Sequence, residues 1–442
     1  MRTYTILFLL STLTFANGAF AKFEAHEWGT FTSLVGSNGI TQNGMYHEDE
    51  RLPAFVHGFG ETRPASSSID MNLLRPLAFG PIPDPEATPV PRPPCRNKGC
   101  FGDEVLKTNV ITQKMETPVI YFYADHAQHI DVNVKFPEGV FTETYPAPVS
   151  STPQRNDKNF AITNGQAHFA VDVLAQKTAS VPYVESENIY SHARNVNSNV
   201  VRNGNEQEKF IFYRGLGRFQ PRFSITSQNG AVALQVPANA MPQAAFLVHV
   251  DQQGQSQLLE VSGLVAGQRK VIPATTIQVL ENHNSKSQAV LTGARAKNTL
   301  VAALVRSGLY QDEAQAMINT WENGYLKVPG LRLLYILPRA EVDQVLPLNF
   351  SPAPENFTRV FVGRIEILID TEEKQILTSI LQQRENFDVA SLGRFAEPML
   401  RRVLQVYQAN PRLATQAADE TLLNTLIDRS LTSDTSHKTS VE

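Results

Sequence analysis

The sequence has two cysteines among its 442 residues, and both lie in the short segment Cys95-Arg96-Asn97-Lys98-Gly99-Cys100. A structural zinc site needs more soft ligands than one such pair offers, and redox cysteine pairs are normally spaced more closely. In an oxidising compartment the pair instead predicts a small structural disulfide, Cys95–Cys100.

Other features that are absent narrow the class of protein. After residue 21 no apolar stretch approaches the roughly 20 residues that a membrane-spanning helix needs, so we expect no membrane span. The formal net charge is −4, which gives no indication of a nucleic-acid partner. The chain also has no Gly-x-Ser-x-Gly motif, so a hydrolase of that class is not indicated.

The start of the chain has the pattern of an export signal. Arg2 supplies a positive charge, 6–13 form an apolar run, and Ala19-Phe20-Ala21 offers small residues at a cleavage site. The apolar run is too short to cross a bilayer as a helix. We therefore expect a signal peptide at 1–21 and a periplasmic or secreted chain that begins at Lys22.

The remaining sequence favours a globular protein that is mainly β. Hydrophobic residues make up 42 % of the chain and charged residues 19 %, which suits a packed core. Short alternating segments, separated by Gly, Asn and Pro, recur over roughly 115–280, as is typical of an antiparallel β-sandwich. Beyond 285, helical patterns alternate with two apolar strands. Gly308 and Gly324 are expected to end helices, and Asp370 with Glu373 has capping-box spacing.

These patterns predict an antiparallel β-sandwich with an α+β C-terminal region. The sandwich would occupy 22–284 and carry a long Pro-rich loop at 75–94. The C-terminal region would occupy 285–430 and pack on the sandwich, and a polar tail would follow at 431–442.

The segment Phe23 to Val35 alternates well enough to form one strand. His26, Trp28 and Thr30 would then share one face, while Glu27 and Phe31 would lie on the other. The densest group of chemically useful side chains lies in this strand and the polar segment after it: His26, Glu27, Trp28, His47, Glu48 and His57.

This group has two interpretations. Imidazoles with a carboxylate bind borderline divalent ions such as Zn, and an open coordination position would generate a hydroxide nucleophile. His26, His47 and His57 are the candidate metal ligands in that case, although their spacing matches no established zinc signature. Alternatively, His26 and Trp28 pack within a sheet, and the acids after His47 form a solvated loop.

Arg214 is the remaining candidate site residue. It ends a predicted strand and is followed by Gly215 and Gly217, which permit close backbone approach. Its guanidinium could hold an anion, or it could pair with an acid of the chain.

Several segments are similar to blocks of a family of exported bacterial proteins. The quoted blocks are His26-Glu27-Trp28-Gly29-Thr30-Phe31-Thr32, 115–123, 208–215, 320–339 and 360–366. The resemblance spans most of the mature chain and implies one architecture through 22–430. It brings no activity, cofactor or catalytic residue with it.

Two functions remain open on the sequence. The first is a non-catalytic interaction or binding protein of the cell envelope or surface, whose partner would be an envelope component or a small ligand. The second is a metal-dependent hydrolase that uses the N-terminal histidine–acid group. The sequence does not decide whether the protein is an enzyme.

Overall fold

The structure is a computed structural model that describes residues 22–47, 52–58, 109–154, 160–178, 180–282, 287, 289–411 and 417–432. The predicted signal peptide, the Pro-rich loop, the Cys95–Cys100 disulfide and Glu48 lie outside these residues.

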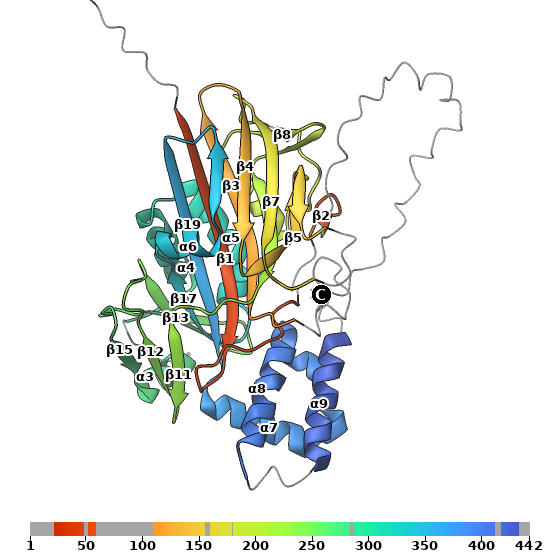
Figure 1. The fold of residues 1–442 in the computed structure, drawn as a ribbon. Helices are drawn as coiled ribbons and strands as arrows, with labels where there is room; N and C mark the ends of the chain where they lie inside the picture. Colours follow the sequence, from red (N-terminus) through yellow and green to blue (C-terminus); the bar gives the residue numbers. More distant parts are fainter. Residues whose placement is uncertain are drawn as a thin grey trace, which may run out of the picture.

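Among the described residues, ten strands form one large sheet (Figure 1). In chain order they are β1 (Phe23–Val35), β2 (His57–Gly58), β3 (Gln113–Ala124), β5 (Gly139–Tyr145), β10 (Ile211–Gly217), β13 (Ala245–Val250), β14 (Ser256–Glu260), β16 (Val290–Thr292), β17 (Gly330–Ile336) and β19 (Asn356–Ile367). Their order across the sheet is β16-β14-β13-β17-β19-β1-β3-β10-β5-β2. β1 is therefore a central strand, antiparallel to β3 and parallel to β19.

A second sheet packs against one face of the first. It is formed by β4 (Gln128–Phe136), β6 (Ser150–Thr152), β7 (Gly165–Val173), β8 (Val201–Asn203), β9 (Glu206–Glu208) and β18 (Leu348–Ser351). β4 and β7 alternate strictly between buried and more exposed residues, because one face packs on the core and the other meets solvent. A small sheet of β11 (Ser224–Gln228), β12 (Ala231–Gln235) and β15 (Arg269–Ile272) extends the same core.

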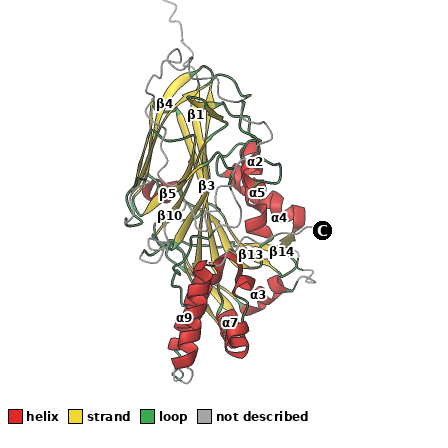
Figure 2. Cartoon of the chain, turned by 90° about the vertical axis from the view of Figure 1, so that its right-hand side faces the viewer, coloured by secondary structure: helices red, strands yellow, loops and turns green. Residues whose placement is uncertain are grey.

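Helices cover the other face of the large sheet, as Figure 2 shows for α2, α4 and α5. The described helices before residue 350 are α2 (Ile189–His192), α3 (Ala274–Glu281), α4 (Gly293–Arg306), α5 (Gln311–Leu326) and α6 (Arg339–Val345). Of these, α3 and α6 instead bury apolar residues in the core on the second-sheet side. α4 and α5 bury their apolar stripes against Trp28 and its neighbours in the sheet. The large sheet is thus covered on both faces.

The last elements form a helical unit at one end of the sheet (Figure 1). It contains α7 (Asp370–Gln383), η3 (Arg384–Asn386), η4 (Val389–Phe395), α8 (Ala396–Gln408) and α9 (Ala417–Thr432), which share a hydrophobic cluster of their own. Within the described residues, none of the helices is long and apolar enough to cross a membrane.

The mainly β fold with a helical C-terminal region is confirmed. The large sheet takes β17 and β19 from the predicted C-terminal region and sets them between β13 and β1, so strands from both sides of residue 284 share one sheet. The division at 284/285 stays a prediction.

Of the three predicted helix signals, the one at Gly308 is confirmed, and those at Gly324 and at Asp370 with Glu373 are wrong. Gly308 has a φ of +112° just after α4, as a helix-ending glycine should. Gly324, in contrast, lies inside α5, where a Cβ would come within 2.7 Å of Arg364 Nη1. The Asp370–Glu373 capping box is also absent, because the N-cap residue of α7 is Ile369 and Asp370 is the first residue of the helix. The Asp370 carboxylate instead accepts hydrogen bonds from the backbone of Asn229 and Gly230.

Candidate functional site

All thirteen residues of β1 are buried, including the polar ones. The predicted alternation is confirmed: Trp28 lies in the hydrophobic cluster beneath α4 and α5, and Phe31 lies in the core between the two sheets. Because both faces of β1 are covered, its alternation does not separate inside from outside. It separates a face that contacts α5 from a face that contacts the second sheet.

On the α5 face, polar side chains of β1 hydrogen-bond to α5 along the length of the helix. These contacts are His26 Nδ1 to Glu313 Oε2 at 2.9 Å, Tyr310 Oη to Glu24 Oε2 at 2.7 Å and Thr30 Oγ1 to Tyr325 Oη at 2.6 Å. Trp28 fills the position between His26 and Thr30 with apolar contact. The spacing of polar residues in β1 therefore fixes the position of α5 on the sheet.

The His26–Glu313 pair is the strongest acid–base arrangement on this face. Glu313 is fully buried at the N-terminus of α5, where the helix dipole favours its negative charge. It also accepts hydrogen bonds from Tyr310 N and Tyr123 Oη, both at 2.7 Å. This contact occupies Nδ1 and leaves Nε2 as the other ring nitrogen of His26. Within the described residues, Nε2 makes no hydrogen bond.

Tyr310 connects this pair to the molecular surface. Its ring is 4.5 Å from the His26 ring between centroids, and the residue is 39 % exposed. Glu24, which accepts from Tyr310, also pairs with Lys22 at 3.0 Å. Burial and then the hydrogen bond to Glu24 raise the pKa of Tyr310, so its hydroxyl is a donor at neutral pH. We call Lys22, Glu24, His26 and Tyr310 the β1–α5 edge.

Glu27 lies on the opposite face and does not join His26. It forms an ion pair with Arg359 and accepts a hydrogen bond from Tyr213, and all three side chains are buried. Burial followed by the charge of Glu27 raises the pKa of Tyr213 well above its usual value, which keeps its proton on the hydroxyl. Arg359 reaches Asp343 as well, at 2.9 Å.

The three candidate metal histidines do not converge. Lys114 of β3 lies opposite Thr32 of β1, and its ammonium group donates to the backbone oxygen of His47. His47 is therefore near the Thr32 end of β1, about six residues, or ~20 Å, along the strand from His26. His57 lies in β2, four strands from β1 in the sheet order, or roughly 19 Å away. Zinc ligands must approach one ion to ~2.1 Å, and the fold does not bring His26, His47 and His57 together in this way, so metal binding by them stays a prediction.

The histidines have other contacts. His57 Nε2 lies 2.6 Å from Glu206 Oε1, and the His47 ring packs on Tyr46 at 4.6 Å between centroids. A search of the described residues finds no group of three or more His, Cys, Asp or Glu side chains that could hold a metal ion.

Arg214 is buried in β10 rather than poised at a strand end. Its Nε and Nη2 both lie 3.3 Å from Thr117 Oγ1, and its guanidinium lies 5.9 Å from the Phe212 ring centroid. The predicted role of Arg214 in holding an anion stays a prediction.

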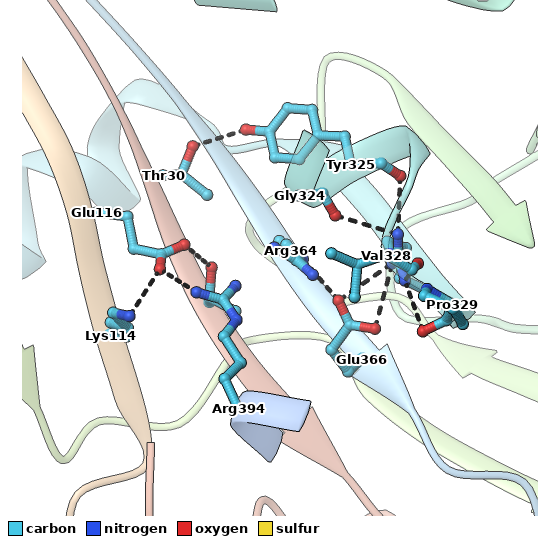
Figure 3. A network of polar contacts seen from close by, with 12 residues as sticks. Thr30, Lys114, Glu116, Gly324, Tyr325, Val328, Pro329, Arg364, Glu366 and Arg394 are labelled. Atoms are coloured by element: carbon cyan, nitrogen blue, oxygen red, sulfur yellow. Dashed lines mark hydrogen bonds and ion pairs between the residues drawn. The ribbon is translucent and has the colours of Figure 1, made fainter. Parts of the chain in front are cut away.

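The sequence interpretation missed a buried charged network at the lower end of β1 (Figure 3). Glu116 accepts from Thr32 at 2.6 Å and from Arg394 at 2.7 Å, and Lys114 lies 3.3 Å from it. Burial alone would raise the pKa of Glu116, but Arg394 and Lys114 hold it well below its usual value. These contacts tie the helical unit to β1 and β3.

Next to this network, two arginines share one carboxylate. Arg364 Nε lies 2.5 Å and Arg332 Nε 3.1 Å from Glu366 Oε1, and all three residues are buried. Arg332 also donates to backbone oxygens at the C-terminus of α5, among them Gly324 and Tyr325. Arginines and a glutamate inside apolar strands are a sequence signal for internal ion pairs, but such a signal does not specify which residues pair.

No protein-family model matches the chain, and no curated protein matches it significantly.

Proposed function

We propose that the protein is exported, is processed to begin at Lys22, and serves as a binding protein for an envelope component or small ligand. The binding site in this proposal is the β1–α5 edge. The observation that carries it is the partly exposed ring of Tyr310, which packs at a tilt against the His26 imidazole, whose Nε2 makes no hydrogen bond in the described residues.

The surroundings of Lys22 support processing at that residue. Its backbone nitrogen donates to Asp125 Oδ2 at 2.9 Å, and Asp125 N donates back to the Lys22 carbonyl at 3.2 Å. After cleavage behind Ala21, this nitrogen would be an α-ammonium group facing a carboxylate. The hydrogen bond would then become an ion pair, so the fold accommodates the new terminus.

The chemistry of the edge suits a polar ligand with one apolar face. The Tyr310 ring offers a stacking surface, while Lys22 and Glu24 offer a donor and an acceptor at its rim. Amphipathic rings of this kind are common anchors in binding sites.

The alternative of a metal-dependent hydrolase built on the N-terminal group has less support, because His26, His47 and His57 lie in separate parts of the fold. Elemental analysis of protein purified without chelators distinguishes the two: the binding proposal expects no stoichiometric metal, and one zinc per chain would favour the hydrolase.

Binding is tested with purified processed protein and isolated cell-wall and membrane fractions, each sedimented separately. We expect retention by one fraction, and Tyr310→Ala should weaken it about tenfold because it removes the stacking surface. Tyr183→Ala is the matched control, since Tyr183 is 85 % exposed and lies outside the edge. Equal retention of Tyr310→Ala and wild type, or no retention of wild type, would contradict the proposal.

A further inference from the structure

The terminal nitrogens of Arg364 are buried without a partner. Arg364 is 0 % exposed, and neither Nη1 nor Nη2 has a hydrogen-bond partner in the described chain. Leaving a buried charged donor unsatisfied costs more than a neutral hydrogen bond contributes, so such groups normally have a bound partner. The two Nη atoms form one edge of the planar guanidinium and can hold a single acceptor between them.

The local charge balance also calls for an anion. Glu366 is shared by Arg332 and Arg364, which leaves this trio with one more positive than negative charge. Burial lowers the pKa of Arg332 to about 10, with Glu366 acting against that shift and the nearby Arg364 adding to it. An isolated charge in a low-dielectric interior is costly unless it is compensated.

The surroundings limit the size of the partner. Gly324 lies so close that a Cβ there would meet Arg364 Nη1 at 2.7 Å, and the Phe395 ring centroid lies 5.4 Å from the guanidinium carbon. Tyr325 is held by its hydrogen bond to Thr30. A bulky ligand would not fit between these groups, which leaves room only for a small one.

We infer that the Nη edge of Arg364 binds a small monovalent anion of the size of chloride, which forms part of the folded structure. The anion would neutralise the surplus charge of the Arg332–Glu366–Arg364 trio and satisfy both Nη groups. This site is independent of the β1–α5 edge and of the proposed binding function.

The inference is tested by thermal unfolding in chloride against gluconate at constant ionic strength. We expect Tm to rise saturably with chloride, by about 2 °C or more, since a ligand that binds only the folded state stabilises it. Arg364→Met should remove the chloride dependence while Glu366 keeps Arg332 as its partner. Arg202→Met removes the same charge from a position 43 % exposed and should leave the dependence unchanged.

A crystal grown in bromide gives a second measurement that does not depend on the folding of the variant. An anomalous peak at the Nη edge of Arg364 supports the inference. An ordered Arg364 with no peak, or with a carboxylate of the chain or water at that position, overturns it. An equal chloride response of wild type and Arg364→Met overturns it as well.

Discussion

The two faces of β1 use buried polar groups in different ways. On the α5 face, Glu24, His26 and Thr30 each bond to a different point of one helix. On the opposite face a single strong cluster, Glu27 with Arg359 and Tyr213, is surrounded by the core between the sheets. Several separate hydrogen bonds along β1 position α5 on the sheet. A single buried ion pair instead makes the stability of the fold depend on both of its residues, because removing either one leaves the other charge buried and unpaired.

The largest effect is expected at Glu27. Glu27→Ala leaves the buried guanidinium of Arg359 without its nearest carboxylate, and breaking such a pair costs ~3–5 kcal/mol of unfolding free energy. Glu24→Ala, on the other face, removes an ion pair whose Lys22 partner has a side chain 53 % exposed, and should cost only ~1 kcal/mol. Urea unfolding of both variants measures the difference, and equal losses would show that the faces do not differ in this way.

Buried carboxylates in different parts of the structure should also give the free energy of unfolding opposite dependences on pH. Glu341 lies on α6, which packs on the second-sheet side with Arg359, and burial raises its pKa to about 7 despite Arg222 nearby. Its folded-state pKa exceeds the unfolded value of ~4.3, so its stabilising contribution is fully present below ~4.3. As pH rises from there to about 7, the free energy of unfolding falls by up to about 3 kcal/mol because of this group. Glu341→Gln should therefore raise stability at pH 8 but not at pH 4.

Glu116 and Glu366 have the opposite dependence. Burial would raise the pKa of each, but adjacent arginines lower it, so their contribution is present above the unfolded pKa of ~4.3. It is lost as pH falls through their depressed folded-state values. Unfolding free energies should be measured from about pH 3 to about pH 8. As the pH is lowered, the value for Glu116→Gln should fall less steeply than that for wild type. A curve for Glu116→Gln parallel to wild type in acid would count against the network.

A smaller effect is expected at Thr30. Thr30→Val leaves the buried hydroxyl of Tyr325 without its 2.6 Å partner and should cost ~1–2 kcal/mol. Adding Tyr325→Phe removes the stranded group, so the double variant should be more stable than Thr30→Val alone. No recovery in the double variant would mean that the threonine acts through packing only.

Much of the fold followed from local patterns, but the partners of the site residues did not. The alternation of Phe23 to Val35 correctly placed His26 and Trp28 opposite Glu27, because period-two alternation is a property of the strand alone. Glu313 lies 287 residues from His26, and no local pattern specifies a contact at that separation. The positions of His47 and His57 were missed for the same reason, since their proximity to β1 in the sequence did not indicate proximity to His26 in the fold.

The most direct test of the role of β1 is a double-mutant cycle between His26 and Glu313, using His26→Ala and Glu313→Gln. If the polar face of β1 positions α5 through one-to-one contacts, unfolding free energies should give a coupling of about 1–3 kcal/mol between the two sites. Additivity within ~0.5 kcal/mol would contradict this account, because His26 would then contribute to the fold independently of α5.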